Sequence, residues 1–258
     1  MKTVKLFLAI LAMAFILPAQ AQSVDEILEN YFENTGGLDA WKSLEGVKMN
    51  AIVNQQGMEI PLEIVQLKDG RQATTIKFQG QEIKQGVFDG ETLWSTNFMT
   101  MKAEKSDAEA TANFKLNTND FPDSFVDYKE KGYTTELVGT EEFDGAEAFK
   151  IKLVKEPVTV DGNQEDDVSY YFFDTENFVP LGMQTEIRSG QAKGMISEVK
   201  FSDYQEVEGL YFAFSMSQGI KDGQSNPITF SSIEINPEVD ESLFAFPEEV
   251  ATEEENKN

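Results

Sequence analysis

Residues Tyr170–Arg188 read YYFFDTENFVPLGMQTEIR, and this stretch decides the class of fold. Its second half, from Leu181, alternates apolar with small or polar residues, which is the period of a half-buried strand. Its first half, Tyr170–Phe173, has aromatic side chains on both faces, and Asp174–Asn177 supplies a turn. The stretch therefore predicts a β-hairpin whose first strand needs apolar neighbours on both sides of the sheet.

Segments with a period of two fill most of the remaining chain, and short turns, many of them Asp-Gly pairs, separate them. Besides the hairpin, we expect strands at residues 47–53, 58–68, 72–78, 82–88, 91–95, 133–139, 148–154, 194–202, 210–217 and 227–235. Most successive strands are joined without a helix of roughly 10–15 residues, which favours an antiparallel meander over a parallel α/β sheet. The pattern predicts a mainly β (α+β) protein with about eleven strands.

Two short helices are expected before the first strand. Ser23 and Glu26 form a capping box ahead of apolar residues at helical spacing, and Gly36-Gly37 ends that helix. A second helical turn spans 38–44. The apolar faces of these helices either pack on the sheet or form a movable lid over a cavity. The lid residues would be Leu28, Phe32 and Trp41.

The strand pattern breaks between Thr96 and Gly132. Within this interruption, 103–116 has high helix propensity, and Phe121-Pro122-Asp123 is expected to start another short helix. An insertion of this length in a β chain often has a functional role. It is either a second lid or a helix packed on the edge of the sheet.

The two ends of the chain are expected to lie outside the folded domain. Residues 1–21 have a basic start, an apolar run and a small-residue cleavage site, which predicts a secretory signal peptide. The run is shorter than the roughly 20 residues of a spanning helix. We expect one domain over 22–250 and a disordered acidic tail over 251–258. Because the chain has no Cys, lipid attachment to a Cys after the signal is not expected.

The chain is strongly acidic, with 46 Asp and Glu residues against 21 Lys and Arg and a formal net charge of −25. Such a surface repels phosphate backbones and anionic membranes, so nucleic acid is not an expected partner. Acidity also keeps a protein that binds apolar ligands soluble.

The residues that most enzymes and metal sites depend on are missing. There is no His and no Cys, which removes the usual nucleophilic triads and zinc sites, and no phosphate-binding or dinucleotide-binding glycine motif is present. The stretch Asp161–Asp167 starts like a calcium loop, but Asp166 stands where Gly is needed, so a solvated hairpin loop is the better interpretation. We expect no metal, no cofactor and no enzymatic activity, with carboxylate catalysis as the remaining enzymatic alternative.

Apolar side chains are the most informative feature. The chain holds 20 Phe, 7 Tyr, 2 Trp and 9 Met. Met and Phe adapt to ligands of imprecise shape such as acyl chains, although for any single residue a place in the core is the commoner explanation.

Five segments carry a resemblance to a known family. They are Tyr31–Trp41 (YFENTGGLDAW), Val87–Trp94 (VFDGETLW), Phe143–Leu153 (FDGAEAFKIKL), Tyr171–Pro180 (YFFDTENFVP) and Ile235–Phe244 (INPEVDESLF). In their order and spacing the chain resembles the LolA/LolB-like periplasmic carriers of outer-membrane lipoproteins, and it is most similar to members from Bacteroidota.

The resemblance implies a strongly curved, half-open antiparallel β-barrel whose open side is plugged by short helices. It also implies a soluble periplasmic carrier or chaperone that binds acyl chains of lipoproteins or lipids, with inner- or outer-membrane transfer proteins as partners. The carriers use an arginine near the lid to bias release. Neither Arg71 nor Arg188, the two arginines of the chain, lies in a matching motif.

Position alone suggests which residues would line such a cavity. They are Phe78, Phe88, Trp94, Met99, Phe172, Met183 and Phe212. The alternative is a protein-binding or envelope-sensor module on the same fold, with a filled core and no lipid cargo.

Overall fold

The computed structural model describes residues 22–55 and 57–247; the predicted signal peptide and acidic tail lie outside these residues. The strands are β1 (Gly46–Gln55), β2 (Met58–Leu67), β3 (Gln72–Phe78), β4 (Gln81–Phe88), β5 (Leu93–Thr96), β6 (Ala103–Lys105), β7 (Thr134–Phe143), β8 (Ala146–Val160), β9 (Asn163–Asp174), β10 (Pro180–Glu186), β11 (Ile196–Val207), β12 (Leu210–Ile220) and β13 (Ser225–Ile235). The helices are α1 (Val24–Asn34), α2 (Leu38–Lys42), α3 (Ala108–Asn117) and the short 3₁₀ helices η1 (Thr118–Asp120) and η2 (Glu241–Leu243).

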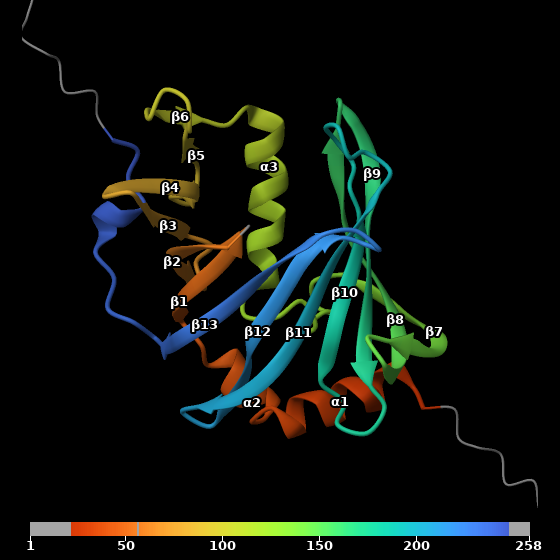
Figure 1. The fold of residues 1–258 in the computed structure, drawn as a ribbon. Coiled ribbons are helices and arrows are strands. Elements are labelled where there is room, and N and C mark those ends of the chain that lie inside the picture. Colours follow the sequence, from red (N-terminus) through yellow and green to blue (C-terminus); the bar gives the residue numbers. More distant parts are fainter. Residues whose placement is uncertain (1–21, 56, 248–258) are drawn as a thin grey trace, which may run out of the picture.

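Thirteen strands within the described residues form one antiparallel sheet, in the order β6-β5-β4-β3-β2-β1-β13-β12-β11-β10-β9-β8-β7 (Figure 1). Two meanders make up this sheet, because each strand of β1–β6 and each strand of β7–β13 pairs with its neighbour in sequence. They join where β1 pairs with β13, with Val47 opposite Ile235. The chain between β6 and β7, residues 106–133, therefore runs from one edge of the sheet to the other; we refer to it as the crossover.

The predicted antiparallel meander is confirmed, but the predicted strand number is too low. Ala103–Lys105, expected to start a helix, instead forms β6 beside β5. The hairpin of β8 and β9 is also longer than expected: its turn is only Asp161-Gly162, and Asn163 already pairs with Val160. Both residues of that turn have positive φ, which allows a tight two-residue connection. The calcium-like stretch, Asp161–Asp167, is therefore mostly strand.

The helices follow the sequence prediction at the N-terminus and depart from it in the crossover. The Ser23 hydroxyl accepts the Glu26 backbone N–H, and the Glu26 carboxylate accepts that of Ser23, so the predicted capping box is present. The helix expected from Asp123 is absent: residues 124–132 form turns. Asp127 has a φ of +52°, which a right-handed helix does not tolerate.

The sheet curls around α3, with the β2–β6 end on one side of this helix and β9 on the other (Figure 1). We call the face of the sheet toward α3 the inner face and the opposite face the outer face. Helices α1 and α2 lie at one end of the curled sheet and contribute to the largest apolar cluster, in which the Tyr31 ring is 5.5 Å from that of Phe173 and the Trp41 ring 5.1 Å from that of Phe212.

The outer face is covered at both ends of the sheet by other parts of the chain. At the β8–β10 end, Phe143 stacks on Phe172 with ring centroids 4.2 Å apart, and a Cβ at Gly182 would lie 2.6 Å from the Phe143 ring. At the β2–β5 end, residues 236–247 pack on the sheet around the buried Phe244. The aromatic residues on both faces of β9 are thus enclosed by protein on both sides.

No helix within residues 22–55 and 57–247 combines the length and the apolar character needed to span a bilayer.

Candidate functional site

A cavity of about 450 Å³ lies between the inner face of the sheet and residues 117–124 of the crossover. Its floor is apolar, because the alternation of β10, β11 and β12 turns every second side chain inward. The floor residues that follow this alternation are Met183, Phe201 and Phe212, and Ala213 also borders the cavity. Phe121 and Pro122 of the crossover face them, and Tyr31 and Trp41 of α1 and α2 line one end.

Two carboxylates line this cavity, those of Asp120 and Asp123, and Asp123 has the less compensated environment. Its Oδ2 accepts a hydrogen bond from the Tyr31 hydroxyl at 3.1 Å, and its Oδ1 accepts the Phe125 backbone N–H at 2.7 Å. Loss of hydration raises the pKa of the Asp123 carboxyl, although both hydrogen bonds act in the opposite direction. The chain therefore keeps an incompletely compensated acid beside an apolar floor.

Three of the tyrosines and a serine add hydroxyl groups to the wall. The Tyr204 hydroxyl donates to the Pro180 carbonyl at 2.7 Å, and the hydroxyls of Ser124 and Tyr171 lie 3.3 Å apart. Burial raises the pKa of the Tyr31, Tyr171 and Tyr204 phenols, so they stay protonated at neutral pH.

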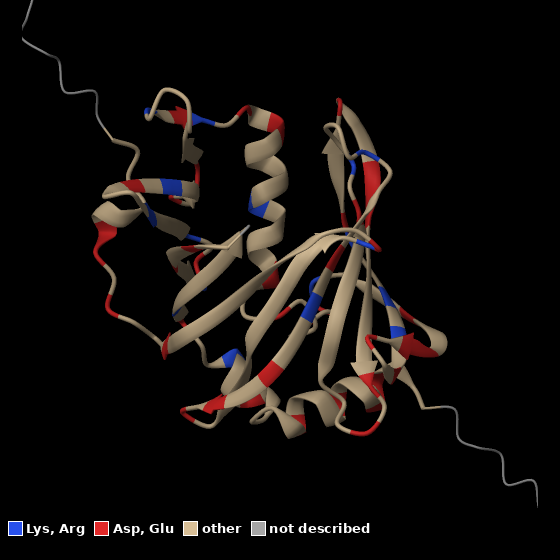
Figure 2. Cartoon of the chain, viewed as in Figure 1, with Lys and Arg blue, Asp and Glu red and all other residues tan. Residues whose placement is uncertain are grey.

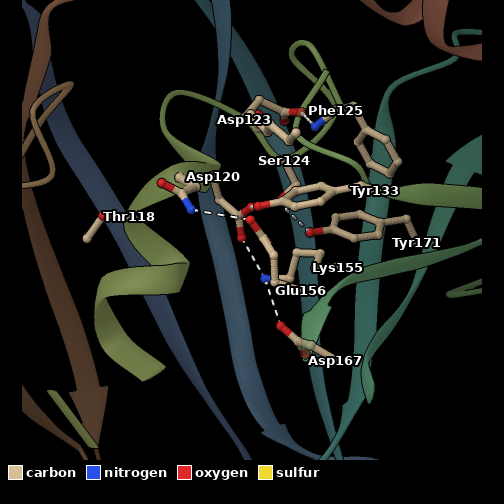
Figure 3. A network of polar contacts seen from close by, with 12 residues as sticks. Thr118, Asp120, Asp123, Ser124, Phe125, Tyr133, Lys155, Glu156, Asp167 and Tyr171 are labelled. Carbon is tan, nitrogen blue, oxygen red and sulfur yellow. Dashed lines mark hydrogen bonds and ion pairs between the residues drawn. The ribbon is translucent and has the colours of Figure 1, made fainter. Parts of the chain in front are cut away.

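A chain of ion pairs behind the cavity holds the crossover in place (Figure 3). Lys155 Nζ of β8 lies 2.7 Å from Asp120 Oδ2 of the crossover and 3.1 Å from Asp167 Oδ2 of β9. Arg188 Nη2 lies 2.9 Å from Asp167 Oδ1, and the Tyr133 hydroxyl donates to Asp120 Oδ1 at 3.1 Å. Burial alone would lower the pKa of Lys155, but the two carboxylates outweigh it and the net shift is upward.

Helix α3 is held by polar contacts at one side. The Asn113 side chain donates to the Thr159 carbonyl at 2.6 Å and accepts the Thr159 N–H at 2.9 Å. The Glu109 carboxylate accepts the backbone N–H groups of Asp161 and Gly162 in the β8–β9 turn. These contacts explain why a helix without an apolar stripe has a fixed place inside the curled sheet.

The structure brings only some of the predicted lining residues to this cavity. Met183 and Phe212 line it, and so does Trp41, which was expected in a lid. Phe78 and Phe88 are on the inner face outside the cavity lining, where the Phe88 ring is 5.3 Å from that of Phe114 in α3.

Three other predicted lining residues point elsewhere. Trp94 lies on the outer face and donates its indole N–H to the Phe244 carbonyl at 3.1 Å, and Phe172 belongs to the outer cluster with Phe143. Met99 is 91% exposed at the tip of the β5–β6 hairpin. The sequence pattern shows which side chains of a strand share a face, but not which face of the sheet is the inner one. A shift of one residue in register also moves every side chain to the opposite face.

The remaining lid candidates, Leu28 and Phe32, are on the buried side of α1 and belong to the largest apolar cluster. They also contribute to a second hollow of about 700 Å³ between α1 and residues 125–130, where acidic residues stand around the edge. That these residues form a movable lid stays a prediction.

Several residues of the cavity were missed by sequence reasoning: Tyr31, Phe201, Asp123 and Tyr204. The sequence predicts that Tyr31 belongs to the first helix and that Asp123 lies at the start of another helix, but it gives neither residue a place in a cavity. What distinguishes the Asp123 carboxyl and the tyrosine phenols is that they lie in otherwise apolar surroundings. This feature can be recognised only when the neighbours in the tertiary structure are known.

Among residues 22–55 and 57–247, no group of three or more His, Cys, Asp and Glu side chains is placed to hold a metal ion. In the calcium-like stretch, the Asp167 carboxylate pairs with Lys155 and Arg188. Within the described residues, the acidic stretch is thus explained by its place in the β8–β9 hairpin and by its ion pairs.

Three solved structures are similar to this chain over nearly their whole length. A domain from Vibrio parahaemolyticus described as an outer membrane lipoprotein-sorting protein has a TM-score of 0.51 at 14% identity, covering 85% of this chain and 94% of that one. A LolA superfamily protein from Nitrosomonas europaea has a TM-score of 0.51 at 13% identity, covering 86% and 96%. A DUF1329 family protein from Desulfovibrio piger has a TM-score of 0.51 at 14% identity, covering 85% and 97%.

No protein-family model matches the chain, and no curated protein sequence matches it. The structural similarities therefore establish the fold, which is that of LolA superfamily and lipoprotein-sorting proteins, as the resemblance of the five segments predicted. The narrower similarity to members from Bacteroidota stays a prediction.

Proposed function

We propose that this protein is a non-catalytic periplasmic carrier that binds acyl chains of a lipid or lipoprotein in the cavity beneath the crossover. The cavity carries the proposal, since about 450 Å³ lies within the range of roughly 300–1,000 Å³ typical of small-molecule sites. Its floor of Met183, Phe201 and Phe212 offers adaptable apolar contacts. Each methylene buried there contributes about 0.8 kcal/mol, so a chain can be held without covalent chemistry.

The fold supports the same proposal. The domain from Vibrio parahaemolyticus is described as a lipoprotein-sorting protein, and its fold extends over most of this chain. Fold does not determine function, so the cavity and its lining provide the independent argument.

Native mass spectrometry of protein purified gently from the periplasm, followed by organic extraction, is the direct test. We expect mass in excess of the polypeptide, and we expect that mass to be extracted as acylated species. A bare polypeptide that also takes up no apolar probe would overturn the carrier and favour a protein-binding module on the same fold.

Charge introduced at the floor tests the location of binding. We expect the variant Met183→Asp/Phe212→Asp to lose at least about tenfold in affinity for the uncharged dye N-phenylnaphthylamine, because a carboxylate there adds desolvation and removes apolar contact. Met99→Asp is the matched control, because Met99 is 91% exposed and lies outside the cavity. Unchanged dye binding by a folded double variant, with circular dichroism as the check, would exclude this cavity as the site.

A further inference from the structure

The hydroxyl groups of the cavity wall have already donated most of their protons. The Tyr31 hydroxyl proton goes to Asp123, and the Tyr204 hydroxyl proton goes to the Pro180 carbonyl. Ser124 and Tyr171 share one hydrogen bond, which leaves one proton between the two of them. A hydroxyl that has donated its proton offers only lone pairs to a ligand, and a carboxylate offers only acceptors. This part of the wall therefore presents mainly hydrogen-bond acceptors.

Other polar groups of the lining do not reverse this balance. The Trp41 indole N–H donates to Thr35, and the Thr118 hydroxyl donates to the Lys115 carbonyl. The Tyr211 hydroxyl, on a side chain that is 38% exposed, can still donate to water or to a ligand. The amide side chains at the edge of the cavity can offer either a donor or an acceptor and so favour neither kind of ligand. They are Gln66, Gln72 and Asn117.

The charges of the lining point in the same direction. Within the described residues, the cavity is lined by two carboxylates, Asp120 and Asp123, and by no Lys or Arg. Asp120 is compensated by Lys155 at 2.7 Å. In the described part of the chain Asp123 forms no ion pair: Lys131 Nζ contacts its backbone carbonyl, at 3.4 Å, instead of its carboxylate.

We infer that the cavity selects amphiphiles whose head group donates hydrogen bonds and carries no negative charge, and that Asp123 is the specificity-determining residue. This inference rests on the proposed carrier function and specifies its ligand class: an acyl chain ending in a hydroxyl, amide or ammonium group is accepted, and one ending in a carboxylate or phosphate is rejected. A negative head group would meet a carboxylate of like charge and hydroxyl groups that have mostly donated their protons already, where low polarity strengthens the repulsion.

Displacement of N-phenylnaphthylamine by three ligands of one chain length, dodecanol, dodecylamine and dodecanoate, tests the inference at neutral pH. We expect dodecanoate to compete at least about tenfold more weakly than dodecanol, and dodecylamine to compete at least as well as dodecanol. The ratio should persist from about 0.15 M to about 1 M salt, where the Debye length falls from about 8 to about 3 Å, because a charge inside the cavity is screened much less than the protein surface.

Asp123→Asn removes the charge and keeps the shape, so it should reduce the discrimination between dodecanol and dodecanoate several-fold. Asp222→Asn is the matched control: Asp222 is exposed in the β12–β13 turn at a φ of +61°, which Asn tolerates, and its loss changes the net charge equally. Equal competition by all three ligands in the native chain would overturn the inference and leave the carrier function standing, whereas absence of dye binding would overturn both. If Asp123→Asn does not fold, the ligand ratio in the native chain at high salt decides.

Discussion

Among single residues, Asp123 stands out because burial makes its carboxyl harder to ionise than it is in water. Loss of hydration raises its pKa above the ordinary value of 3.8, against the effect of the hydrogen bonds from Phe125 and Tyr31. The native state therefore holds this proton more tightly than the unfolded chain does. The associated stability is fully present below the unfolded pKa and is lost as the pH rises through the folded pKa.

Asp123→Asn should consequently change its effect on stability with pH. We expect the free energy of unfolding of the variant, relative to the native chain, to increase as the pH rises from below 3.8 to neutrality, because only the native chain must ionise a carboxyl in this wall. Urea unfolding of both chains at several pH values measures this difference. Asp222→Asn should show no comparable trend, and a difference for Asp123→Asn that is constant with pH would contradict the argument.

At the scale of elements, the crossover has its place because β8 and β9 hold it from behind. Lys155, with 12% of its side chain exposed, joins Asp120 of η1 to Asp167 of β9, and Arg188 after β10 supports Asp167 from the other side. Figure 3 shows Lys155 between Asp120 and Asp167, below the rings of Tyr133 and Tyr171 in this view. The position of the crossover over the cavity therefore depends on Lys155, a charged residue within strand β8.

Lys155→Met should destabilise the protein by roughly 2 kcal/mol. It leaves Asp120 without its cation, whereas Asp167 keeps Arg188 at 2.9 Å. The value is below the roughly 3–5 kcal/mol of fully buried pairs because of this remaining partner and because Asp120 keeps 21% of its side chain exposed. Chemical denaturation measures the loss, and hydrogen exchange should locate the increased opening in the crossover. Lys48→Met, which removes an exposed pair with Glu63, is the control and should cost no more than about 1 kcal/mol. Equal losses in the two variants would show that the network has no special role.

At the scale of the whole molecule, a net charge of −25 acts on a fold that joins the first strand to the last. Figure 2 shows Asp and Glu residues on most elements and along many turns, with far fewer Lys and Arg residues. Each meander is local in sequence, but the β1–β13 pairing brings residues almost 190 positions apart into register, as Val47 and Ile235 show. Compaction therefore brings an excess of like charge together.

Salt should therefore stabilise the native state. Raising NaCl from about 0.01 M to about 0.15 M shortens the Debye length from about 30 to about 8 Å and screens this repulsion. We expect the urea midpoint to rise, with KCl giving the same result as NaCl. A midpoint that falls would mean that the attractive surface pairs, such as Lys129 with Asp25, outweigh the repulsion.

Local structure could be predicted from residues that are close together in the chain. The capping box at Ser23, the β10 alternation and the Gly-containing turns specify their elements through contacts between residues close in the chain. Antiparallel meanders could therefore be predicted from the sequence. The strand number was underestimated, because a strand as short as Ala103–Lys105 exists only through its pairing with β5. No periodicity can reveal a strand of three residues.

Only the tertiary structure decided which apolar residues line the cavity. Met183 and Phe212 reach it, whereas Trp94 and Phe172 lie on the outer face beneath residues 236–247 and Phe143. Alternation says that neighbouring side chains lie on opposite faces, but which face is inner depends on the curl of the sheet and on the path of the crossover. The polarity of the wall is likewise a tertiary property, because Asp123 meets Tyr31 only when segments 92 residues apart come together.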